Sequence, residues 1–159
     1  MTERHGLGLV TSFGWNSRLS SFPYEHLAVS QNWYNGPKVK PVDWIGSSRR
    51  DLRAFPKSVK ETVGEALYFA QNGKKHPTAK PLKGFGGASV LEIVEDHIGD
   101  TYRAVYTVKF EEAVYVLHCF QKKSKQGIST PQNEIELVER RLKIAEDRHR
   151  EWIEQQKNK

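Results

Sequence analysis

The chain has 159 residues, of which 37% are hydrophobic and 28% charged, so its composition is that of a folded protein and not of a disordered one. Its 25 basic and 19 acidic residues give a net charge of +6, which favours a polyanionic partner. A single cysteine, Cys119, excludes an internal disulfide framework and a cysteine-based zinc site. No segment approaches the roughly 20 apolar residues that span a bilayer, so we expect a cytoplasmic protein without a membrane partner.

Residues 1–38 differ in character from the remainder of the chain. They contain glycines, prolines and isolated aromatic residues, and no regular element is predicted among them. We interpret 1–38 as a leader or arm that is partly disordered, and 39–159 as the folded domain.

The first part of the domain is predicted to contain a strand and two helices. A short edge strand covers 39–45, because the proline within it is tolerated at an edge and not in a central strand. A short helix capped by Ser47 or Ser48 follows. Pro56 then starts a longer helix, whose apolar residues recur at helical spacing and which Gly73 ends.

The second part is predicted to be a basic loop over 74–87, a three-stranded sheet and a long helix. The strand-like runs are rich in Val, Ile, Tyr and Leu and lie at 88–96, 101–109 and 113–120. Because only short polar turns separate them, they should form an antiparallel meander. The final helix begins at Thr130 and Pro131, and its apolar residues recur in alternating steps of three and four. This seam either packs on the domain's own sheet or binds a partner.

Basic residues gather at the ends of this predicted sheet. They are Lys74, Lys75, Lys80 and Lys83 before its first strand, Arg103 on its second, and Lys122, Lys123 and Lys125 after its third. In a meander such positions can face one concavity and bind a phosphate backbone, although Lys74 and Lys75 fit ordinary solvated loop residues better. An arginine in a central strand needs a carboxylate or a phosphate that offsets the cost of its burial. Glu92 is the local carboxylate, so a structural Arg103–Glu92 pair is the alternative to a catalytic arginine.

Five segments follow one another in order between residues 42 and 145. They are VDWIGSSRRDLRAFP, AKPLKGFGG, SVLEIVED, TYRAVYTV, and VLHCFQKKSK with the TP and ERRLK that come after it. Together they resemble the RelE/HigB superfamily of toxins, in its phage-type HigB-like branch. The resemblance covers about two-thirds of the chain and leaves out residues 1–38.

The resemblance implies a fold and a function. The fold is α+β and RelE-like, with a short strand, two helices, a three-stranded antiparallel meander and a long C-terminal helix. The function is that of a toxin of a type II toxin–antitoxin system, an endoribonuclease (mRNA interferase) that cleaves messenger RNA in association with the ribosome. Its partners are messenger RNA, the ribosome and a cognate helix-turn-helix antitoxin, and we expect no cofactor and no metal.

The resemblance also implies roles for basic residues. The arginine of the family's YRxxY strand falls on Arg103, the basic pair after the last strand on Lys122 and Lys123, and the basic residue of the turn on Lys83. The further candidates for RNA contact are Lys80, Lys125 and Tyr106.

Cleavage of RNA by its own 2′-hydroxyl needs a proton acceptor, a cation beside the phosphorane and a proton donor, and it needs no metal. Arg103 suits the cation, because a guanidinium keeps its proton. Neighbouring cations make a lysine easier to deprotonate, so Lys122 or Lys123 is a candidate base, and Glu92 is another. His118 is an acid or base if it faces the groove, although its alternation with apolar neighbours favours a core position.

The chain departs from the family pattern on the first strand of the meander. Glu92 and Val94 stand where the family often has lysines, and the C-terminal tyrosine of some members has no clear match. These departures favour an alternative function, that of a non-catalytic nucleic-acid-binding or phage accessory protein with the same fold.

Overall fold

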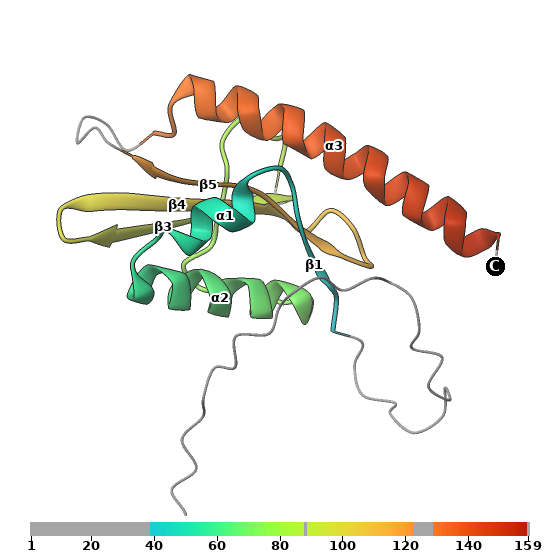
Figure 1. The fold of residues 1–159 in the computed structure, drawn as a ribbon, viewed down its shortest axis with the longest axis horizontal. Coiled ribbons are helices and arrows are strands. Elements are labelled where there is room, and N and C mark those ends of the chain that lie inside the picture. Colours follow the sequence, from blue (N-terminus) through green and yellow to red (C-terminus); the bar gives the residue numbers. More distant parts are fainter. Residues whose placement is uncertain (1–38, 88, 123–128, 159) are drawn as a thin grey trace, which may run out of the picture. The chain divides into compact units, whose positions relative to one another are not determined.

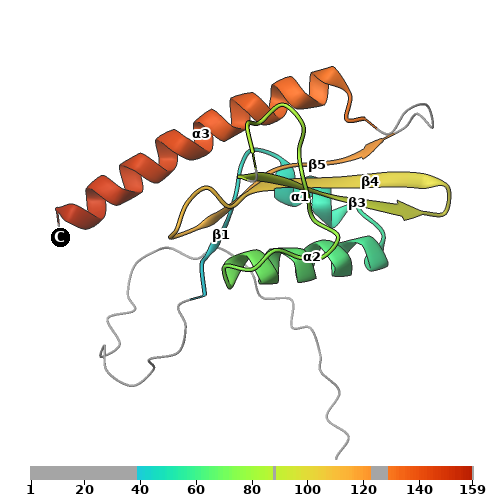
Figure 2. The ribbon, with the colours of Figure 1, turned by 180° about the vertical axis from the view of Figure 1, so that it is seen from behind.

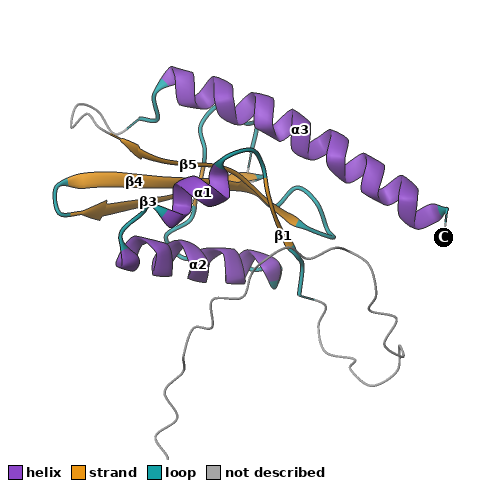
Figure 3. Ribbon diagram, viewed as in Figure 1, coloured by secondary structure: helices purple, strands orange, loops and turns teal. Residues whose placement is uncertain are grey.

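The computed structural model describes residues 39–87, 89–122 and 129–158, which form five strands and three helices (Figures 1 and 3). The strands are β1 (Val42–Trp44), β2 (Lys80–Pro81), β3 (Val90–His97), β4 (Asp100–Thr107) and β5 (Val114–Lys122). The helices are α1 (Ser48–Arg53), α2 (Lys57–Gln71) and α3 (Gln132–Lys157). The predicted α+β element order is confirmed, with β2 added inside the predicted loop. The predictions for residues 1–38 lie outside the described residues.

The strands form one sheet in the order β1-β5-β4-β3-β2. Its centre is the predicted antiparallel meander of β3, β4 and β5. The predicted edge strand is β1, which pairs parallel with β5 and sets Val42 opposite Val114. At the other edge, β2 pairs antiparallel with β3 and sets Lys80 opposite Glu92. Successive side chains of a strand point to opposite faces, so this register decides which charged residues meet.

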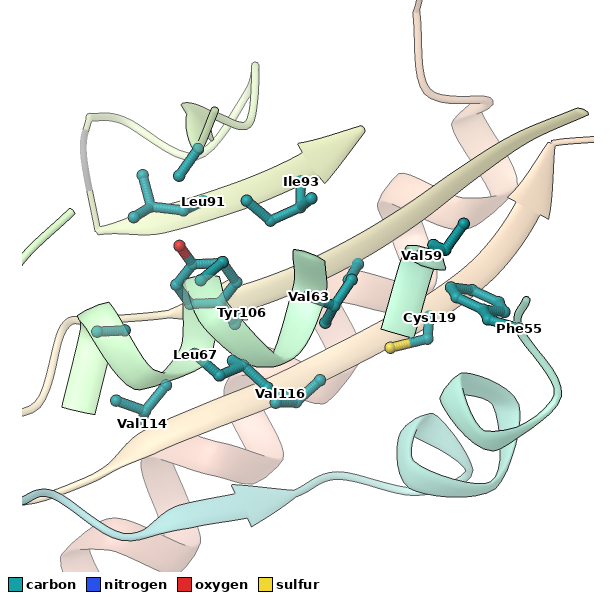
Figure 4. Close-up of a cluster of buried hydrophobic side chains, with 14 residues drawn as sticks. Phe55, Val59, Val63, Leu67, Leu91, Ile93, Tyr106, Val114, Val116 and Cys119 are labelled. Atoms are coloured by element: carbon teal, nitrogen blue, oxygen red, sulfur yellow. The ribbon is translucent and has the colours of Figure 1, made fainter. Parts of the chain in front are cut away.

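Helices cover both faces of the sheet, with α3 on one side and α2 on the other (Figures 1 and 2). The α2 face is an apolar core in which Val63 and Leu67 of α2 pack with Tyr106, Val116 and Cys119 of the strands (Figure 4). The α3 face is a second core, which includes Val105, Tyr115, Leu117, Val138 and Ala145. The seam of the final helix therefore packs on the domain's own sheet. No helix in the described part of the chain combines the length and the apolar character that crossing a membrane requires.

Prolines and a glycine mark the helix ends, close to the predicted positions. Pro56 and Pro131 each stand at the N-cap, one residue before the first residue of α2 and α3. Their fixed φ suits a helix start, where the missing N–H costs nothing. Gly73 follows the C-cap of α2 with a φ of +69°, a conformation that favours glycine.

The pairing of β4 with β5 contains a β-bulge. Val105 lies opposite His118 while the next residue, Tyr106, lies opposite Val116, which leaves Leu117 without an opposite residue. His118 is therefore on the α3 face with Phe120, whose ring stacks on it at a centroid distance of 4.8 Å, whereas Val116 is on the α2 face. Strand alternation thus holds for His118 and Phe120 but not for His118 and Val116. The prediction of a core position for His118 is confirmed, because its side chain is buried.

Candidate functional site

Arg103 lies on β4, on the face that α3 covers, and is only 3% exposed. Its Nη1 donates hydrogen bonds to Oε2 of Glu92 at 2.6 Å and to Oγ1 of Thr130 at 3.0 Å. The Thr130 hydroxyl in turn donates to the same Glu92 oxygen at 3.3 Å. Register explains the pair: Arg103 is opposite Val94, so Glu92 is its diagonal neighbour on the same face. The Arg103–Glu92 pair that the sequence predicted is present.

Lys122 joins this group from the end of β5. It is opposite Thr101 of β4, so it shares the α3 face with Arg103, and it is 8% exposed. Its Nζ donates to the carbonyl oxygen of Ser129 at 3.0 Å. The two residues that precede Pro131, Ser129 and Thr130, thus contact both buried cations. We call Glu92, Arg103, Lys122 and Thr130 the buried cluster.

The other predicted lysines differ in where they lie. Lys80 is opposite Glu92 at the sheet edge, so it borders the buried cluster, and its side chain is exposed. Lys83 is exposed in the turn after β2. Lys123 and Lys125 lie outside the described residues.

Tyr106 is 1% exposed and belongs to the core on the α2 face. Three positions after Arg103 on the same strand, it points to the opposite side of the sheet. Burial raises the pKa of its hydroxyl to about 12. The prediction that Tyr106 contacts RNA is therefore wrong, because α2 covers the face on which the ring lies.

His118 is 6% exposed and is held at both ring nitrogens. Its Nδ1 lies 2.9 Å from Nη1 of Arg141, which can only donate, so Nδ1 accepts. The proton is therefore assigned to Nε2, which donates to Oε2 of Glu134 at 2.6 Å. Burial is the largest cause that lowers the pKa of His118, while the hydrogen bond to Glu134 acts in the opposite direction. The ring is a neutral link between β5 and α3.

Arg141 extends this link to α1. Its Nη1 donates to the carbonyl oxygen of Leu117 at 2.9 Å, and its Nη2 donates to Oγ of Ser47 at 2.8 Å. The Ser47 hydroxyl donates to Oδ2 of Asp51 at 2.6 Å. Ser47 is the N-cap residue of α1, but it caps through no side-chain hydrogen bond to the backbone. The sequence predicted the cap and missed the contact with Arg141, for which the only signal was the ERRLK segment.

A model of the family described as Phage derived protein Gp49-like (DUF891) matches residues 50–143, more than half of the chain. The chain belongs to the Gp49-like family. This is a RelE/HigB-type toxin family, so the resemblance seen in the sequence is confirmed, and with it a toxin kind of function. The matched residues of this Gp49-like chain contain Glu92, Arg103, His118, Lys122 and Arg141.

Other comparisons add little to the family match. The Gp49-like chain is similar to the solved structure of a mutant of the E. coli toxin RelE in the free state, at 19% identity and a TM-score of 0.40. That similarity covers 55% of this chain and 88% of the other. No curated protein matches the sequence.

Metal-ligating side chains do not gather in this part of the Gp49-like chain. Within the ranges that the structure describes, no group of three or more His, Cys, Asp or Glu residues is placed to hold a metal ion. The buried cluster brings together two cations, Arg103 and Lys122, and the carboxylate of Glu92.

The stability of the Gp49-like domain should fall in mild acid because of His118. The unfolded chain binds a proton at the ordinary pKa of about 6.5, whereas the folded ring does so only at a lower pH. Between these two values the unfolded state holds more protons, so the free energy of unfolding rises with pH up to about 6.5. Urea unfolding across this range should show the slope in the wild type and a flatter one in His118→Gln. Equal slopes in both proteins would contradict the role of His118.

Proposed function

We propose that this protein is the toxin of a type II toxin–antitoxin system and cleaves messenger RNA in association with the ribosome. The observation that carries the proposal is a buried, carboxylate-paired arginine on the central strand of a RelE/HigB-type toxin. Its proposed partners are the messenger RNA, the ribosome and a cognate helix-turn-helix antitoxin.

The proposed reaction is an attack of the RNA 2′-oxygen on the adjacent phosphorus, which releases the 5′-oxygen. Arg103 stabilises the negative charge of the phosphorane, because a guanidinium offers paired donors and keeps its own proton. Glu92, Lys122 and Lys123 are the candidates to take the 2′-hydroxyl proton and to protonate the leaving oxygen. Lys80, Lys83 and Lys125 contact the RNA backbone. His118 is excluded from proton transfer in this scheme, since both of its ring nitrogens are held by α3.

RNA must displace protein contacts to reach this arginine. Arg103 is 3% exposed, and its Nη1 is bonded to Glu92 and Thr130. A phosphate oxygen can bind Nη1 only by replacing the oxygen of one of these two partners. The same burial favours a second candidate function, a nucleic-acid-binding protein that has the fold without the chemistry.

Expression of the wild type and of Arg103→Lys in a bacterium tests the proposal. The lysine keeps a positive charge beside Glu92, but it lacks the planar fork that binds two phosphate oxygens. We expect the wild type to arrest growth and shorten transcripts, and the variant to cleave about 10²–10³-fold more slowly. Mapping of transcript ends after brief induction is the measurement, and circular dichroism controls for folding.

Growth and intact transcripts in both strains would overturn the proposal. RNA binding with a steep salt dependence and without cleavage would support the second candidate function instead.

A further inference from the structure

A group of exposed cations surrounds the junction of α1 and α2, outside the buried cluster. We call it the α1–α2 corner, and its residues are Arg49, Arg50, Arg53, Lys57 and Lys60. Arg49 is partly exposed and the other four are exposed. Five basic residues within twelve positions are a local excess of charge, and only Asp51 among these positions is acidic.

The fold gathers these cations into one rigid surface. Arg49 and Arg50 stand four and three residues before Arg53, which is the spacing of one helix face. The Nζ of Lys60 donates to the carbonyl oxygen of Arg53 at 3.3 Å, so the first turn of α2 lies against the end of α1. Between the helices, Phe55 is buried and its ring contacts Tyr102 at a centroid distance of 4.9 Å. The corner is therefore anchored to the sheet.

Nearby carboxylates neutralise this charge only in part. Asp51 accepts the hydrogen bond of Ser47 and lies 3.5 Å from Nε of Arg50. Glu61 lies 3.7 Å from Nζ of Lys57. Among the described residues, no carboxylate lies within ion-pairing distance of Arg49, Arg53 or Lys60. The corner thus keeps a net positive charge.

The corner lies at the same end of the sheet as the buried cluster. Tyr102, which Phe55 contacts, directly precedes Arg103, and the Ser58 hydroxyl lies 3.1 Å from Nδ1 of His97. Figures 1 and 2 show the start of α2, the turn between β3 and β4, and the end of β5 at this end. A strand of RNA that passes around it would meet the corner on one face and Arg103 on the other.

We propose that the α1–α2 corner binds the phosphate backbone of RNA beyond the bond that is cleaved. The choice of RNA rests on the function proposed above, and the surface itself supports it. Protein interfaces are built around apolar or aromatic anchors. No residue of the corner or between its members is an exposed large hydrophobic side chain. Cations without such an anchor fit a polyanionic backbone better than they fit an acidic protein.

The test compares two variants that each remove two positive charges from exposed residues. Arg50→Gln with Arg53→Gln changes the corner, and Lys74→Gln with Lys75→Gln changes the loop after α2. The probe is a short single-stranded RNA with methylated 2′-hydroxyls, which binds but cannot be cleaved. We expect the slope of log K against log salt to weaken by about 0.7 for each phosphate that the corner variant no longer neutralises. The loop variant should keep the wild-type slope, and both should keep the wild-type melting temperature.

Equal slopes for the two variants would overturn the proposal, and so would displacement of the RNA by polyglutamate as readily as by unlabelled RNA. Because the probe is not cleaved, these outcomes do not depend on catalysis. Failure of the wild type to cleave ribosome-bound messenger RNA would contradict the proposed function and leave the binding result of the corner standing.

Discussion

Replacing Glu92 with leucine is expected to lower the free energy of unfolding by about 3–5 kcal/mol. The change leaves the guanidinium of Arg103, which is 3% exposed, without the carboxylate 2.6 Å away. An uncompensated buried charge costs far more than the pair itself contributes, because desolvation offsets most of the attraction. Urea unfolding at neutral pH measures the difference.

The double variant Glu92→Leu, Arg103→Met separates charge from packing. It removes both charges and keeps most of the side-chain volume, so most of the stability should return. Glu61→Leu, at an exposed residue of α2, should change stability by less than about 0.5 kcal/mol. If Glu92→Leu lowers the free energy of unfolding as little as Glu61→Leu does, the Arg103–Glu92 pair is solvated.

Tyr106→Ala is expected to destabilise the domain by about 3–5 kcal/mol, as removal of a buried ring usually does. The ring is 1% exposed between the sheet and α2, so its removal takes away apolar burial and leaves a cavity. Thermal and urea unfolding of the purified variant measure the effect.

Tyr106→Phe is the matched control for the same position. It keeps the ring and should cost less than about 1.5 kcal/mol. Its affinity for RNA should equal that of the wild type, because the Tyr106 ring lies under α2. If Tyr106→Phe weakens the affinity for RNA and leaves the stability unchanged, Tyr106 contacts RNA despite its burial.

The fold was largely predictable because its signals are local. Prolines at the helix starts, Gly73 at a helix end and polar turns between apolar runs each act over a few residues. The Arg103–Glu92 pair was also predictable, since strand alternation and a short hairpin turn bring the two onto one face. Strand alternation places Arg103 and Glu92 together, but it does not distinguish a structural pair from a catalytic one.

The remainder of the site depends on long-range packing. Alternation from Arg103 already directs Tyr106 to the other face, but only the position of α2 shows that this face is covered. The contacts of Thr130 and Arg141 depend on where α3 crosses the sheet, which no local pattern encodes. The bulge at Leu117 was hidden because the run from Val114 to Phe120 is apolar except for His118, so an extra residue in it disturbs no pattern of polar and apolar positions.

The bulge at Leu117 divides β5 into two stretches with different roles. Tyr115 and Lys122 are seven residues apart, an odd interval that in a regular strand would place them on opposite faces. The surplus residue restores them to one face, so a single strand supports the apolar contact with α3 at one end and delivers a cation at the other. A regular strand that kept Tyr115 against α3 would therefore place Lys122 on the α2 face, away from Arg103.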